Sequence, residues 1–211
     1  TVGQGANTNA IGPELMFAQQ LDEYYDDPIL IIKTAWGGKS LHKDFRPPSA
    51  GGETGQFYKK MIAEYREGLD KIGNEFPHLA ELEPVLSGFV WLQGWNDMFD
   101  EAARKDYQAN LICLINDLRK EVKQADLPIV IGELGNGGLN VNKNMLSIRI
   151  AQKAAAESLG SNAVFVSTTQ FAREAGDSPN VGHGHHWFGN AESYFLIGDT
   201  LGKALLRLNK K

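Results

Sequence analysis

The sequence predicts an α/β fold in which helices cover both faces of a central parallel sheet. Short apolar runs, rich in β-branched and aromatic residues, are bounded by Gly, Pro or Asp, as in strands that are covered on both sides. Amphipathic segments of helical length separate these runs. Strand and helix therefore alternate along the chain, and this alternation is typical of βα units that build a parallel sheet.

Four runs are expected to form the sheet. Each is apolar throughout instead of alternating, which favours burial on both sides. The runs are residues 29–34 (ILIIKT), 88–92 (GFVWL), 128–134 (PIVIGEL) and 163–167 (AVFVS).

Five segments are expected to be helices. The first follows Pro13, which suits the first turn of a helix, and the last begins at Asn190, which suits an N-cap. Apolar residues recur at helical spacing in these segments and predict one face packed on the sheet. The segments are residues 14–25, 55–72, 107–122, 142–159 and 190–208.

Composition limits the class of protein. The chain has 211 residues, 42% of them apolar, and a net charge of −5, which suits one domain with a real core. No basic block is longer than the Lys210–Lys211 pair, so a nucleic-acid surface is not expected. No apolar run approaches the ~18–20 residues of a membrane span. The single cysteine, Cys113, lies in a helical pattern and is expected to be a buried thiol.

Distinctive polar and glycine-rich sequences accompany the predicted strand ends. TAWGGKSLHKDFRPP comes with the first strand, QGWND with the second and GELGNGGLN with the third, and HGHHWFGN precedes the last helix. Open α/β sheets bind their ligands at the carboxyl ends of their strands. We therefore expect these segments to converge on one edge of the sheet.

Two of these segments carry candidate oxyanion donors. Gly37–Gly38 either presents backbone N–H groups closely to a substrate or forms a plain tight turn. Gln93 and Asn96 carry amides that can donate to an oxyanion. Asn96 and Asp97 are also ordinary turn residues, whereas Gln93 is not a turn former.

Three of the five histidines, His183, His185 and His186, lie within four positions. The cluster fits a general base before a helix, a metal site or a solvated loop. A metal site is less favoured, because an HExxH helix, clustered cysteines and a carboxylate at ligand spacing are all missing. His42 and His78 are expected to be incidental surface residues.

Taken in order, these segments resemble the SGNH-hydrolase superfamily and, within it, the sialate O-acetylesterase-like (SASA) domain, also called carbohydrate esterase family six. The resemblance rests on IGPELMFAQQL, IIKTAWGGKSL, GFVWLQGWND, LPIVIGELG and HHWFGNAESYFLIGDTLGKAL, and it treats residues 1–211 as one domain. It implies a three-layer flavodoxin-like fold. It also implies removal of acetyl groups from carbohydrates by a Ser–His pair with an acidic partner, no cofactor, and an exported enzyme.

The resemblance also implies roles for individual residues. His186 corresponds to the catalytic histidine, and Gln93 with Gly37 or Gly38 corresponds to the oxyanion hole. Asn96 is the second choice of amide donor, because GWND resembles the GxND block of the superfamily. Candidates for stacking on a sugar ring, of which at least one is expected to pack instead, are Trp36, Trp95 and Trp187.

The chain departs from the family pattern at three positions. The serine of the family's GQSN turn has no counterpart near Thr1, and no motif supports Ser40 as the nucleophile. Trp95 stands where the family often has Glu. His183 stands where the family usually has Asp. Candidate replacements for the acid, without motif support, are Asp97 and Asp177.

We therefore expect a first strand and a nucleophilic serine upstream of Thr1. The main alternative is a non-catalytic carbohydrate-binding relative, because the serine and both acidic positions are unmatched. A weaker alternative is a metal-dependent hydrolase built on His183, His185 and His186.

Overall fold

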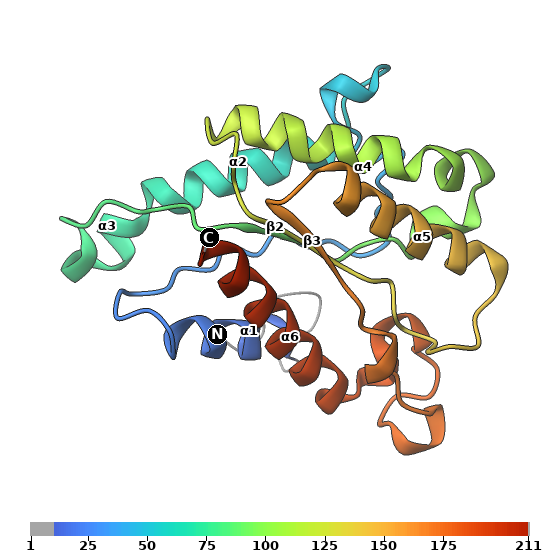
Figure 1. The fold of residues 1–211 in the computed structure, drawn as a ribbon. Helices are drawn as coiled ribbons and strands as arrows, with labels where there is room; N and C mark the ends of the chain where they lie inside the picture. Colours follow the sequence, from blue (N-terminus) through green and yellow to red (C-terminus); the bar gives the residue numbers. More distant parts are fainter. Residues whose placement is uncertain (1–10, 211) are drawn as a thin grey trace.

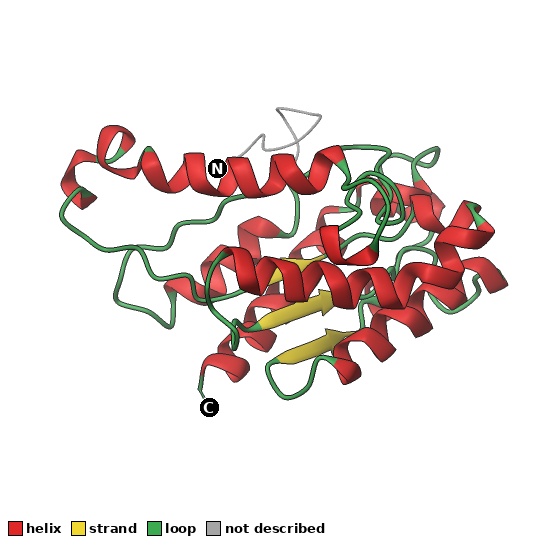
Figure 2. Ribbon diagram, turned by 90° about the horizontal axis from the view of Figure 1, so that it is seen from above, coloured by secondary structure: helices red, strands yellow, loops and turns green. Residues whose placement is uncertain are grey.

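The computed structural model describes residues 11–210, and their central sheet has three parallel strands. The strands β1 (Phe89–Trp91), β2 (Ile129–Gly132) and β3 (Ala163–Val166) lie side by side in that order (Figure 2). In register, Phe89 lies opposite Ile129, which in turn lies opposite Ala163. The predicted parallel sheet is confirmed.

Helices follow and precede the strands as the alternation predicts. Side-chain caps fix three helix starts, since Asp100, Asn142 and Asn190 each accept a backbone N–H of the first turn. The Asp100 cap explains why the third predicted helix begins at Glu101, six residues before its predicted start at Tyr107. The helices are α1 (Glu14–Asp22), α2 (Gln56–Asp70), α3 (Ile72–Glu75), α4 (Glu101–Glu121), α5 (Lys143–Ser158) and α6 (Ala191–Asn209).

The molecule has three layers. Helices α2, α4 and α5 lie on one side of the sheet, and α1 and α6 lie on the other (Figure 1). Alternate residues of β2 serve the two sides, because strand side chains alternate. Ile129 and Ile131 pack in the core with α4 and α5, whereas Val130 packs with α6. This arrangement confirms the expected fold class.

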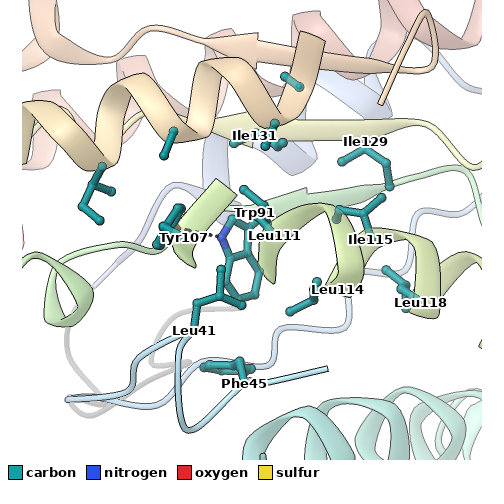
Figure 3. Packing of buried hydrophobic residues seen from close by; sticks show 14 of the residues in the cluster. Leu41, Phe45, Trp91, Tyr107, Leu111, Leu114, Ile115, Leu118, Ile129 and Ile131 are labelled. Carbon is teal, nitrogen blue, oxygen red and sulfur yellow. Dashed lines mark hydrogen bonds between the residues drawn. The ribbon is translucent and has the colours of Figure 1, made fainter. Parts of the chain in front are cut away.

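The larger core also holds part of the glycine loop, the segment of residues 37–45. Leu41 and Phe45 are buried against Trp91 of β1 and the apolar face of α4 (Figure 3). The Trp91 indole donates a hydrogen bond of 3.3 Å to the buried Tyr107 hydroxyl, which is drawn as a dashed line in Figure 3. The loop that carries Gly37 and Gly38 is therefore tied to the rigid core.

Helices α1 and α6 pack closely through two glycines of α6. A Cβ atom at Gly198 would overlap the Pro13 carbonyl oxygen, and one at Gly202 would lie 2.8 Å from the Gln20 Cβ. Glycine is therefore required at Gly198 for the backbones to approach. None of the helices within residues 11–210 is both long and apolar enough to cross a bilayer.

Two expectations from the sequence are wrong. Residues 29–34 form no strand within the described chain, and β1 has a strand neighbour only on its β2 side there. A parallel strand is defined by its ladder with a neighbour, which apolar composition alone does not supply. Cys113 is half-buried instead of buried.

Candidate active site

Loops that are far apart in the sequence meet beside the carboxyl ends of the strands. The rings of Trp95 and His185 have their centroids 5.6 Å apart. The Asn136 amide donates to the Gly184 carbonyl at 3.2 Å. A Cβ atom on Gly38 would lie 3.8 Å from the Asn96 Nδ2. These contacts confirm that the glycine loop, the loops after β1 and β2, and the histidine loop (residues 183–188) converge.

Asp97 anchors the glycine loop through hydrogen bonds to its backbone. It is fully buried, and its Oδ2 accepts the Leu41 N–H at 2.8 Å and the Gln93 Nε2 at 2.7 Å. Its Oδ1 accepts the His42 N–H at 2.9 Å. Burial raises the pKa of Asp97, and the three hydrogen bonds act in the opposite direction. Within residues 11–210 this carboxylate makes no hydrogen bond to the histidine loop, so its geometry is that of a structural anchor.

Gln93 ties β1 to the same loop. Its Nε2 donates to the Lys39 carbonyl at 3.0 Å as well as to Asp97. The Tyr107 hydroxyl lies 2.7 Å from the Gln93 backbone carbonyl and 3.0 Å from its side-chain oxygen, and the same carbonyl accepts the Gln152 Nε2 at 2.8 Å. Because an amide nitrogen carries two hydrogens, Gln93 has no donor left for an oxyanion in this conformation.

Other donors at this edge are unclaimed. The N–H groups of Gly37 and Gly38 and the side-chain amide of Asn96 have no acceptor within residues 11–210. Gly37 and Gly38 are exposed, and Gly38 has a φ of +70°, which glycine adopts without strain. By contrast, the Ser40 hydroxyl and N–H both bond to Asp44. The open donors are therefore the two glycines and Asn96.

The histidine loop has an unusual backbone that a buried anchor maintains. Trp187 and Phe188 both have a φ of +53°, which is rare for bulky side chains and persists only where the surroundings enforce it. The Trp187 indole is buried in the core beside α6. Hydrogen bonds join the Phe188 N–H to the His183 carbonyl and the Tyr194 hydroxyl to the His186 carbonyl. The anchored turn leaves the three histidines exposed.

The three imidazoles lie next to one another. The ring centroids of His185 and His186 are 4.3 Å apart, and those of His183 and His185 are 5.3 Å apart. Partial desolvation lowers the pKa of His186, and charge on His185 and His183 adds to this effect. A lowered pKa favours the neutral imidazole, which is the form that accepts a proton.

The structure supplies no acidic partner for His186 within residues 11–210. Asp177 is exposed, and its contact with the helix start runs through its backbone carbonyl, which accepts the Asn190 amide.

No group of three or more His, Cys, Asp or Glu side chains in the described chain could hold a metal ion.

The three candidate stacking residues have different environments. Trp36 packs against Phe45 and Phe57 in an aromatic cluster at centroid distances of 5.9 and 5.1 Å. Trp187 is buried. Trp95 is half-buried and lines a pocket that has a volume of about 230 Å³. Trp95 also packs against Phe99 and His185 at centroid distances of 5.8 and 5.6 Å, and its place beside the pocket keeps it as the candidate sugar platform.

Sequence reasoning missed a second buried anchor, Glu133. Its carboxylate accepts hydrogen bonds from the Ser167 hydroxyl at 2.6 Å and the Thr168 and Thr169 N–H groups at 2.9 and 3.1 Å. Burial alone would raise the pKa of Glu133, but these hydrogen bonds outweigh it and hold the pKa below its usual value. Arg149 lies 3.8 Å away. The sequence did contain one sign of this buried carboxylate, because Glu133 lies inside the apolar run PIVIGEL.

His42 also differs from its expected role. It is half-buried, its N–H is held by Asp97, and its Nδ1 lies 3.6 Å from Asp106. It belongs to the anchored loop, whereas His78 is exposed as expected.

Open backbone N–H donors, a side-chain amide and a histidine cluster therefore lie at one edge of the parallel sheet. The family model of the sialic acid-specific acetylesterases, a group of carbohydrate esterases known as SASA, matches residues 2–207. The chain therefore belongs to this carbohydrate esterase family.

One solved structure extends this likeness to the fold. The chain is similar to a protein from Arabidopsis thaliana known by X-ray analysis, with a TM-score of 0.70 and 21% sequence identity, over 98% of this chain and 72% of that chain. At this identity the likeness shows the fold alone. A comparison with curated proteins gives no match.

Proposed function

We propose that the protein is a carbohydrate O-acetylesterase that works by serine acyl transfer. Family membership supports a carbohydrate esterase-like role. The observation that carries the proposal is the set of open donors, Gly37, Gly38 and Asn96, held at the same edge as the imidazole of His186, whose pKa is lowered by partial desolvation. Such an arrangement suits an ester whose carbonyl oxygen becomes negatively charged.

In this proposal the serine comes from a segment upstream of Thr1. Support comes from β1, whose edge away from β2 has no strand neighbour within residues 11–210. The apolar segment 29–34 also lacks a ladder within the described chain. An additional parallel strand at this edge would pair with β1, and its carboxyl end would deliver a nucleophile to the same edge of the sheet.

The reaction then has two acyl transfers. The serine hydroxyl attacks the acetyl carbonyl while His186 accepts its proton, and His186 then gives this proton to the leaving sugar oxygen, which departs as a hydroxyl group. A Gly37 or Gly38 N–H and the Asn96 amide stabilise the tetrahedral oxyanion, and each such donor lowers the barrier by ~3–4 kcal/mol. Water then attacks the acetyl-enzyme while His186 accepts its proton, and His186 returns this proton to the serine oxygen as acetate leaves. Gln93 and Asp97 act by positioning, because their hydrogen bonds hold the glycine loop.

The test is esterase activity of the full-length protein on p-nitrophenyl acetate and on an acetylated oligosaccharide. We expect turnover that His186→Ala abolishes and Asn96→Ala lowers by two to three orders of magnitude in kcat, by the known worth of one oxyanion donor. His78→Ala is the control, because His78 is exposed on the turn after α3. Unchanged turnover in His186→Ala would refute the mechanism.

A non-catalytic carbohydrate-binding relative is the second candidate. It is favoured by one specific observation, the lack of a carboxylate beside His186 in the described chain. An acidic partner orients the imidazole, and its loss lowers kcat by a large factor. Binding of a sugar by the full-length protein without turnover would support this candidate against the esterase.

A further inference from the structure

The first turn of α6 carries a tyrosine that holds the backbone of the proposed catalytic histidine. Helix α6 begins directly after the histidine loop (Figure 1), and the half-buried ring of Tyr194 packs against the same core as Trp187. Its hydroxyl donates a hydrogen bond of 2.9 Å to the His186 carbonyl. Burial raises the pKa of Tyr194 to about 12, and the charge of Glu14 adds to this effect, so the hydroxyl remains a donor at neutral pH.

The two peptide units that flank the His186 Cα atom are both restrained. The His186 N–H donates to the His183 carbonyl at 2.9 Å, and the His186 carbonyl accepts the Tyr194 hydroxyl. Because a peptide unit is planar, a hydrogen bond to its N–H or its carbonyl limits the rotation of the whole unit. The direction of the His186 side chain is therefore set from both sides of its Cα atom.

A second side chain holds the histidine loop from the direction of β2. Asn136, which is buried in the loop after β2, donates its Nδ2 to the Gly184 carbonyl at 3.2 Å. This carbonyl belongs to the peptide unit before His185, whose ring centroid lies 4.3 Å from that of His186. The part of the loop that carries these two imidazoles is thus bonded to α6 at one end and to the β2 loop at the other.

These hydrogen bonds act on a strained turn. Trp187 and Phe188 both have a φ of +53°, and a conformation that bulky residues rarely adopt persists only where its surroundings enforce it. The peptide unit that Tyr194 restrains is the one immediately before Trp187. Loss of this hydrogen bond frees that unit to rotate toward a less strained conformation, and the rotation displaces the His186 imidazole.

We propose that Tyr194 and Asn136 are positioning residues that fix the imidazole of His186 through its backbone. In a Ser–His–Asp triad this orienting role belongs to a carboxylate that is hydrogen-bonded to the imidazole, and no carboxylate takes that place beside His186 within residues 11–210. The inference rests on the proposed function, because it concerns the proposed base, and it adds how the described chain holds that base without an acidic partner.

Tyr194→Phe removes the hydroxyl and keeps the ring that packs in the core. In the full-length protein we expect kcat for p-nitrophenyl acetate to fall about tenfold, since a displacement of ~1 Å can lower a rate by ~10²-fold. KM should be unchanged, because the base acts in the transition state and not in substrate binding. Tyr65→Phe is the matched control. It removes the same hydroxyl from a half-buried tyrosine of α2, on the other side of the sheet, and should leave kcat unchanged.

NMR titration of the His186 ring measures its environment without relying on turnover. The pKa of His186 is lowered from 6.5 by partial desolvation, and charge on His185 and His183 adds to this effect. A freed loop exposes the imidazole to water, so the midpoint in Tyr194→Phe should rise toward 6.5. The thermal midpoint should fall by at most ~2–4 °C, which corresponds to one hydrogen bond in a protein of this size. A merely structural role predicts this loss of stability without the rise in the titration midpoint.

Asn136→Ala tests the second restraint and should raise the His186 midpoint in the same direction. An unaltered midpoint in either variant overturns the role of the residue that it replaces, even where kcat falls, because general destabilisation also lowers kcat. Unaltered kcat in Tyr194→Phe, in a full-length protein that hydrolyses the ester, overturns the proposal as well. A full-length protein without turnover refutes the proposed function, and the titration midpoints alone then decide the positioning roles, so the two failures are distinguishable.

Discussion

Replacing Asp97 by Asn probes how the glycine loop is held. The two oxygens of Asp97 accept three hydrogen bonds, from the Leu41 and His42 N–H groups and the Gln93 amide, at 2.7–2.9 Å. Asn keeps the shape but turns one oxygen into a donor, so at least one of these N–H groups loses its acceptor in either orientation.

The magnitude follows from burial. A buried donor without a partner destabilises a protein by ~1–3 kcal/mol. Removal of a buried charge offsets part of this, because burial disfavours the ionised Asp97 and raises its pKa. We therefore expect a net loss of about 1–2 kcal/mol in the free energy of unfolding.

Denaturant unfolding measures the global change, and amide hydrogen exchange measures the local one. In Asp97→Asn the Leu41 and His42 amides should exchange faster than in the unaltered protein. Asp44→Asn is the matched control, because Asp44 also accepts hydrogen bonds in this loop, from Ser40, but is only half-buried. Unaltered exchange at both amides, together with unaltered stability, would refute the anchoring role.

Three further predictions follow, two for substitutions and one for a pH profile. Gly198→Ala should lower the free energy of unfolding by ~1–3 kcal/mol through overpacking against Pro13, even though alanine favours helix; a thermal midpoint equal to or above that of the unaltered protein would contradict this close approach. Glu133→Gln should lower it by ~2–3 kcal/mol, because the hydrogen bonds to a charged acceptor weaken. The pKa of Glu133 is lowered in the fold from 4.5, so its contribution is present above pH 4.5 and lost as the pH falls through the folded-state value; the variant should show a smaller acid-induced loss in denaturant titrations. The pKa of His186 is lowered from 6.5, so the acid limb of kcat/KM for the full-length enzyme should lie below pH 6.5; a midpoint above that value would exclude His186 as the base.

Much of the fold could be predicted because it is encoded locally. Three of the four apolar runs become β1, β2 and β3, and the helical segments appear close to their predicted bounds. The exception is residues 29–34. A helix satisfies its own backbone, whereas a strand depends on a neighbour that can lie anywhere in the chain, so composition alone overpredicts strands.

The site could be predicted at the level of loops but not of hydrogen bonds. The rule that parallel strands end at one edge of the sheet correctly predicted that Gly38, Asn96 and the histidine loop lie close together. The sequence offered Gln93 as the first choice of donor, yet whether an amide is free depends on which groups the fold places around it. Here Lys39, Asp97 and Tyr107 surround Gln93, and none of these partners follows from a local pattern.

Asp97 and Glu133, which follow two different strands, hold neighbouring loops in the same way. Each carboxylate follows a strand and accepts two consecutive backbone N–H groups of a neighbouring loop: Leu41 and His42 for Asp97, Thr168 and Thr169 for Glu133. Charge-assisted hydrogen bonds of this kind are strong and hold the loop through its inner backbone groups. The loop then needs no hydrogen bonds on its outer face, which explains how the N–H groups at Gly37 and Gly38 remain available to a substrate.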